Sequence, residues 1–353
     1  MQRDRIHHVQ VLRFLAAASV AFTHLASLLV DPTPLNAWMR SVPWAGGVDL
    51  FFVISGFIMF FLSQGSFGAP GAALQFIKRR IIRIVPSYWF FTTITIFVVL
   101  ILGGRVGGTT IDSAQVITSY GFVPWPRADG QMNPIVSQGW TLNYEAFFYL
   151  MFAAGLVIRR GIAIIFVAFT MLALVHPFVP ENIFILKFWS DPIILEFLGG
   201  IALARIYLSG VRLRPAGAVA CAVSAIFLFV AMSGLPFGEY QRFVQLGMPA
   251  ILLSASLILS PEPAELGIFR KWLQRCGDAS YTTYLSHYMV VNAFAIVWNG
   301  LSIGMPWVGV ALGMGSVILT GLFFYRNVER PITDALRRRL GEGRPPTAET
   351  AAP

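Results

Sequence analysis

The sequence predicts an all-α membrane protein, a polytopic bundle of about ten transmembrane helices. Its 353 residues are 56% hydrophobic and only 12% charged, whereas soluble domains carry about 25% charged residues. The mean hydropathy is +0.68. The apolar runs extend over roughly 17 to 22 residues without polar alternation, which is typical of spanning helices and not of barrel strands. Helices also satisfy their own backbone hydrogen bonds in lipid.

Ten apolar runs define the expected spans, in the order 9–30, 44–63, 84–103, 141–158, 161–178, 191–208, 215–233, 244–260, 279–298 and 305–325. If the loops alternate between the two sides of the membrane, 21 of the 26 Lys and Arg residues fall on the side of the N-terminus and five on the other. This asymmetry is the positive-inside pattern, and it predicts that both termini are cytoplasmic.

The net charge of +9 is therefore mainly a signal of orientation, and we expect no nucleic-acid partner. Residues 1–340 form one integral membrane domain, with a longer outer loop at about 104–140. The small, polar and Pro-rich tail 341–353 is expected to be disordered. Cys221 lies in a span and Cys276 on the inner side, so no disulfide is expected.

The first span carries Arg13 and His24. Eleven residues separate them, which places both on one helix face roughly 16 Å apart at 1.5 Å per residue. Charged and titratable residues inside a membrane are costly and usually line a functional cavity. The alternative is an arginine that reaches the interface and a histidine hydrogen-bonded within the bundle.

The second span carries Asp49 about one turn from its outer end and Ser55 two turns deeper. Gly47 and Gly56 allow a neighbouring helix to approach closely. These residues therefore indicate either packing glycines beside an interfacial acid or a polar binding surface.

Before the third span, Arg80 and Arg83 stand three residues apart and are neighbours on a helix. Paired guanidinium groups bind phosphates well. The alternative is a determinant of orientation that also touches anionic lipid.

Two further acids stand near the outer ends of spans. Glu145 shares a helix face with Tyr149, and Glu196 lies about one turn inside the sixth span. Together with Asp49 they predict a polar outer vestibule, although each is also explained as an acid at a helix start.

The ninth span places His287 near the middle of the membrane, with Ser280 and Tyr284 on a similar face. His24 and His287 are thus both expected to point into the bundle. No cluster of ligands has metal-binding spacing, so no metal is expected.

These motifs, in this order, resemble acyltransferase family 3 of bacterial membrane proteins. The resemblance covers nearly the whole chain and includes the first-span Arg-x10-His pair, the second-span Gly-Val-Asp-Leu-Phe-Phe-Val-Ile-Ser-Gly-Phe segment and the inner Arg pair. Three more segments agree with it, beginning at Trp140, Ser280 and Val328. Thr141 stands where many relatives carry Ser, which keeps a hydroxyl group. The segments around Glu145 and Glu196 resemble the branch that acylates exopolysaccharides.

The resemblance implies transfer of an acyl group, usually acetyl from acetyl-CoA, to a hydroxyl of an extracytoplasmic glycan at the bacterial inner membrane. The partners are then an acyl-CoA, a polysaccharide or lipid-linked glycan acceptor and membrane lipid, with no tightly bound cofactor. We expect His24 to act as general base or acyl carrier, assisted by Arg13, Glu145 and His287. His287 is expected as an oxyanion donor or a second acid/base group.

The expected contacts of the two substrates follow from the same spans. Arg80, Arg83 and Arg13 are expected to hold the CoA phosphates. Asp49, Ser55, Trp140, Tyr149 and Glu196 are expected to contact the acceptor. A transporter or glycan flippase would share the helices and buried ionisable residues but would not consume acetyl-CoA, and a scaffold would not need Arg13 and His24 buried together.

Overall fold

The computed structural model describes residues 6–30, 44–102, 112–127, 130–232, 235, 238, 240–262 and 267–340. Within these ranges the chain is all-helical and contains no strand. The tail 341–353 and the basic residues Arg3, Arg5, Arg40 and Arg105 lie outside the described residues.

A helix occupies each of the ten predicted spans. In chain order these are α1 His7–Leu29, α3 Gly47–Ser63, α4 Ala72–Leu102, α6 Trp140–Leu156, α7 Gly161–Val175, α9 Leu195–Leu208, α10 Pro215–Ala231, α11 Met248–Ile258, α13 Ser280–Gly300 and α14 Pro306–Phe324. The shorter elements used below are α5 Ser113–Tyr120, α8 Phe184–Ser190, η7 Phe243–Gly247, α12 Ile268–Asp278, η8 Tyr325–Glu329 and α15 Arg330–Arg339.

Among the described residues, five helical segments are long and apolar enough to cross a membrane, namely His7–Leu29, Gly47–Ser66, Ala72–Ile101, Gly161–Phe178 and Pro306–Arg339. Two further apolar helices are shorter, Pro215–Ala231 and Phe243–Ile258. Of the remaining expected spans, α6 has 17 residues and α9 has 14, so both are shorter than these five segments. α13 has 21 residues, but its buried Ser, Thr and His side chains lower its hydropathy.

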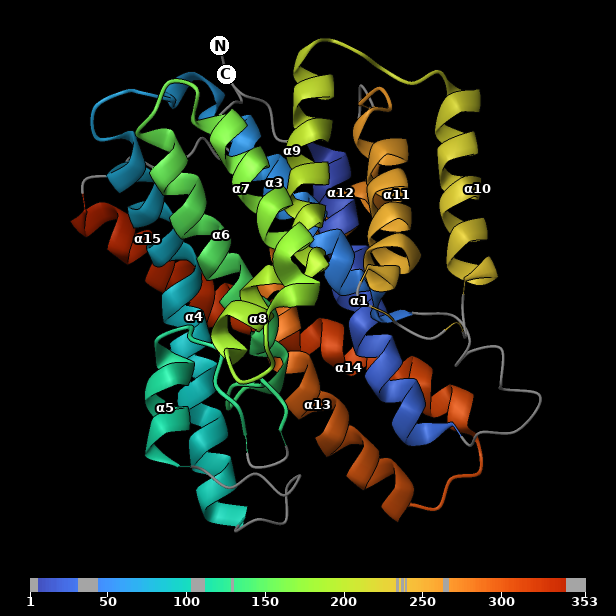
Figure 1. The fold of residues 1–353 in the computed structure, drawn as a ribbon. Helices are drawn as coiled ribbons and strands as arrows, with labels where there is room; N and C mark the ends of the chain where they lie inside the picture. Colours follow the sequence, from blue (N-terminus) through green and yellow to red (C-terminus); the bar gives the residue numbers. More distant parts are fainter. Residues whose placement is uncertain are drawn as a thin grey trace.

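α3 lies at the centre of the bundle, packed on α1, α9 and α11 (Figure 1). A Cβ atom on Gly56 would overlap the carbonyl of Phe197, and one on Gly200 would overlap the carbonyl of Val53. These two glycines therefore let the backbones of α3 and α9 touch. Gly47 lies in the same way against Ala16 of α1, so the interpretation of Gly47 and Gly56 as packing residues is confirmed.

The helices α10 and α5 lie at two edges of the bundle (Figure 1). α10 stands at one edge and packs on α11 (Figure 1). At another edge α5, from the segment expected as an outer loop, is fastened to α4, because Trp89 Nε1 donates to the carbonyl of Tyr120 at 3.0 Å and Thr93 Oγ1 lies 2.6 Å from the Tyr120 hydroxyl. α4 itself runs without interruption through Pro86, so the basic segment with Arg80 and the third span form one helix.

Candidate active site

Two imidazole rings face each other where α1 and α13 pack together. The ring centroids of His24 and His287 are 5.4 Å apart, with 34° between the ring planes. Tyr288 packs edge-on against His24 at 5.5 Å. His24 is half-buried, whereas His287 is completely buried. The tertiary fold thus brings together two histidines that are 263 positions apart in the chain.

The hydrogen bonds of His287 determine which of its nitrogens carries the proton. Nδ1 lies 2.5 Å from the carbonyl oxygen of Tyr284, and a carbonyl oxygen only accepts, so Nδ1 is the protonated donor. Nε2 is buried and has no hydrogen-bond partner among the described residues. In this tautomer Nε2 offers a lone pair and no proton. It can therefore accept a proton or a hydrogen bond, and it can donate to an oxyanion only after His287 is protonated.

Tyr284 joins the histidine pair to the start of α6. Its ring packs against His287 at 5.5 Å and edge-on against Phe51 of α3 at 5.3 Å. Its hydroxyl donates to the carbonyl of Gln138 and lies 3.1 Å from Thr141 Oγ1. The Tyr284 contacts hold the His287 turn of α13 against α3 and α6. Tyr284 belongs to the Ser280–His287 segment of the predicted ninth span. Its position in that segment did not predict a function for it.

A second polar group surrounds Glu145 of α6. Ser55 Oγ donates to Glu145 Oε1 at 2.6 Å, and the hydroxyl of Tyr149 donates to the same oxygen. The guanidinium of Arg80 lies over the rings of Phe76 and Tyr149, at 5.3 and 5.8 Å from their centroids. Three expected site residues from two spans, α3 and α6, thus form one cluster with Arg80 of α4.

The inner end of the bundle carries a third group. Arg13 is buried and donates to Gln10 Oε1 at 3.1 Å. It interacts electrostatically with Arg83 and with the buried Glu329 of the π-helical turn η8. Thr282 of α13 donates a hydrogen bond to Glu329. Arg13 and Arg83, expected to act together, therefore do lie near each other, with a carboxylate close by.

Asp49 and Glu196 belong to a fourth group that the sequence did not reveal in full. Both carboxyls are completely buried. Arg242 Nη2 lies 3.2 Å from both carboxylate oxygens of Asp49, and the guanidinium also interacts electrostatically with Glu196. The structure therefore divides the three acids of the expected outer vestibule, because Glu145 belongs with Ser55 and Tyr149.

Arg242 was treated only as an outer basic residue, because its partner is 193 positions away. It stands immediately before the π-helical turn η7, and Gly247 at the end of that turn lies against the Glu196 carboxyl. Such π-turns occur frequently at functional sites.

Trp140 joins none of these polar groups and instead packs edge-on against Phe52 and Tyr144, at 6.5 and 5.9 Å.

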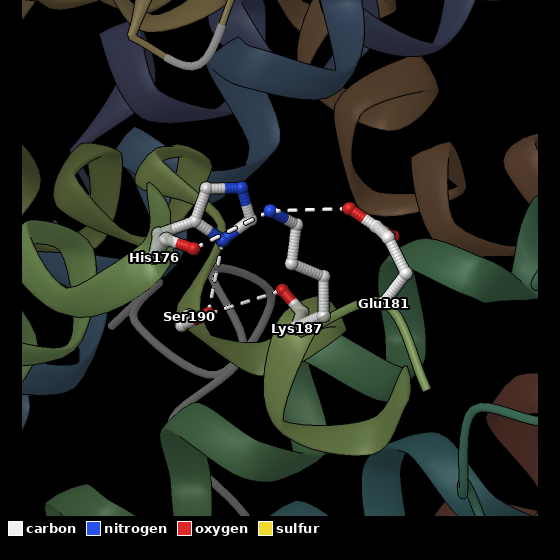
Figure 2. Close-up of polar contacts among 4 residues, drawn as sticks. All are labelled: His176, Glu181, Lys187 and Ser190. Carbon is white, nitrogen blue, oxygen red and sulfur yellow. Dashed lines mark hydrogen bonds and ion pairs between the residues drawn. The ribbon is translucent and has the colours of Figure 1, made fainter. Parts of the chain in front are cut away.

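A further serine–histidine contact, between α7 and α8, is structural (Figure 2). His176 Nδ1 lies 2.9 Å from Ser190 Oγ, which itself donates to the carbonyl of Lys187 at 3.1 Å. The histidine is therefore the donor in this contact, the reverse of what a base acting on a serine requires. Lys187 Nζ also donates to the His176 carbonyl at 3.3 Å and pairs with Glu181 at 3.3 Å. These bonds fasten α8 to the end of α7.

The fold and these sites define the class of protein: an all-helical membrane protein with ionisable side chains gathered inside its bundle. The family model of an acyltransferase domain matches residues 6–326, and the chain belongs to this family, acyltransferase family 3. This confirms the resemblance seen in the motifs.

Two curated proteins are similar along most of their length. The exopolysaccharide production protein ExoZ of Rhizobium meliloti is 33% identical over 302 residues, which cover 84% of this chain and 91% of ExoZ. The acyltransferase MdmB of Streptomyces mycarofaciens is 25% identical over 380 aligned positions, covering 95% of this chain and 93% of MdmB. No solved structure matches the chain.

Proposed function

We propose that this protein transfers an acyl group, acetyl from acetyl-CoA, to a hydroxyl of an extracytoplasmic carbohydrate such as an exopolysaccharide. Membership of the acyltransferase family and the name of ExoZ support the reaction class and the kind of acceptor. The observation that carries the proposal is the His24–His287 pair, since paired imidazoles inside an apolar bundle have a cost that a purely structural role does not explain.

In this proposal His24 is the group that handles the proton. Its imidazole takes the proton from the acceptor hydroxyl, the oxygen attacks the thioester carbonyl, and the C–S bond breaks. The proton then passes from the imidazolium to the CoA thiolate. In the variant with a covalent carrier, the imidazole attacks the thioester carbonyl and the C–S bond breaks, so that CoA leaves as the thiol with the imidazole proton. The acceptor hydroxyl then attacks the acyl-imidazole, and its proton returns to the imidazole nitrogen as the C–N bond breaks. His287 lies beside His24, with the ring centroids 5.4 Å apart, and in this proposal its Nε2 lone pair is a second proton acceptor at the site.

The donor is held from the inner side in this proposal. Arg80 and Arg83 contact the CoA phosphates, and Arg13 assists them beside Arg83. The pantetheine arm then follows the face of α1 from Arg13 to His24, a distance of roughly 16 Å along a helix. Glu145 keeps Arg80 and Tyr149 in place, as a positioning residue. Asp49 and Glu196 serve the acceptor side. The protein acts in the bacterial inner membrane with ten spans and both termini cytoplasmic.

The test is transfer of radiolabelled acetyl from acetyl-CoA to carbohydrate by the purified protein in proteoliposomes. The variant His24→Ala is expected to lose transfer by at least about a hundredfold, the lower end of acid/base effects. The control His7→Ala, at the first residue of the same helix, is expected to keep it. Equal activity of His24→Ala and wild type would refute the role of His24. Movement of carbohydrate without acetylation would identify a transporter instead.

A further inference from the structure

α12 is a short helix that lies directly against the start of α1. A Cβ atom on Gly277 would overlap the carbonyl of Gln10, so the two backbones touch there. Trp272 packs edge-on against Phe14 of α1 at 5.6 Å. After Ala279 the chain continues into α13, which carries His287. α12 is therefore anchored to α1 and α13, the two helices of the histidine pair. Among its own residues, Asp278 at its end interacts electrostatically with Arg13 of the third polar group.

At 100° per residue, α12 has an apolar side and a basic side. On the apolar side, Cys276 and Gly277 are buried against the bundle. The rest of the apolar side is partly or fully uncovered, with exposures of 89% for Ile268, 66% for Phe269 and 40% for Trp272. The opposite side carries three exposed basic residues, Arg270, Lys271 and Arg275.

A bilayer interface satisfies both uncovered sides of this helix. Amphipathic helices with aromatic and aliphatic residues on one face and basic residues on the other lie in the plane of the interface. Their apolar face enters the acyl-chain boundary, and the basic residues meet the negative surface of anionic lipids. Trp is also enriched at this depth, because its ring is apolar and its N–H is polar.

We propose that α12 lies in the headgroup layer of the membrane and binds anionic lipid. Ile268, Phe269 and Trp272 enter the acyl-chain boundary, and Arg270, Lys271 and Arg275 contact the lipid phosphates. α15 provides a contrast within the same chain: it ends in Arg337, Arg338 and Arg339 but contains no aromatic residue. Both helices therefore carry a cluster of three basic residues, and of the two only α12 combines it with exposed aromatic residues.

The test is quenching of Trp272 fluorescence by brominated lipids in vesicles of the full-length protein. The signal of Trp272 is the difference between wild type and Trp272→Phe. It is expected to be quenched in brominated phosphatidylglycerol more strongly than in brominated phosphatidylcholine. The triple variant Arg270→Gln, Lys271→Gln, Arg275→Gln is expected to lose this preference and to retain several-fold less phosphatidylglycerol after purification. The matched variant Arg337→Gln, Arg338→Gln, Arg339→Gln is expected to leave Trp272 quenching unchanged.

Two results would overturn the proposal. Absence of Trp272 quenching in both lipids would place α12 outside the membrane. Equal quenching in the two lipids, unchanged in the α12 triple variant, would show that the basic side does not bind anionic lipid. Neither readout depends on acyl transfer, so the proposal stands or falls independently of the catalytic one.

Discussion

Removal of the Arg242 guanidinium is expected to destabilise the bundle, because it leaves two completely buried carboxyl groups without a counter-charge. Breaking a buried ion pair by deleting one partner costs about 3–5 kcal/mol. The Asp49 side chain is fully buried, but the Arg242 side chain is 25% exposed, which reduces the loss. We therefore expect Arg242→Gln to lower the free energy of unfolding by about 2–4 kcal/mol.

The assay is thermal unfolding of the detergent-purified protein, followed by loss of its monodisperse size-exclusion peak. Arg242→Gln is expected to unfold several degrees below wild type. The double variant Asp49→Asn, Arg242→Gln is expected to recover at least about 1 kcal/mol, because one of the two unpaired carboxyl groups is gone.

The control is Arg330→Gln, whose guanidinium reaches Asp334 only at 4.0 Å and on an exposed surface, so its effect stays within about 0.5 kcal/mol. An Arg242→Gln protein as stable as wild type, or a double variant no better than the single one, would refute the charge-pair reasoning.

Three further outcomes follow from the packing and from the site. His287→Ala is expected to lower kcat about a hundredfold with little change in KM for acetyl-CoA; an unchanged kcat in the transfer assay would exclude an acid/base or orienting role. Arg80→Ala combined with Arg83→Ala is expected to raise KM for acetyl-CoA about tenfold or more, and an unchanged KM would leave the pair as orientation signals only. Gly56→Val is expected to cost at least about 1–3 kcal/mol of stability through overlap with α9, whereas Gly315→Ala, which meets no neighbouring atom, is expected to be neutral; equal thermal stability of the two would contradict the close contact of α3 and α9.

The sequence by itself determined the helical class, the presence of a described helix in each of the ten apolar runs, and the family. Apolar runs and the polar residues between them are local features of the sequence. An apolar run in lipid forms a helix, because unpaired backbone N–H and C=O groups are too costly there. The sequence also predicted which residues are neighbours along one helix. Glu145 and Tyr149 share a face by spacing alone, and the structure joins them by a hydrogen bond.

Only the tertiary structure decided which helices face one another. The contact of His24 with His287, the bond from Ser55 to Glu145 and the pairing of Arg242 with Asp49 each join helices far apart in the chain. Spacing along one helix carries no information about such partners, because they depend on helix rotation and close approach across the bundle. Small residues such as Gly56 and Gly200 allow that approach, and the assembled bundle selects the polar partners.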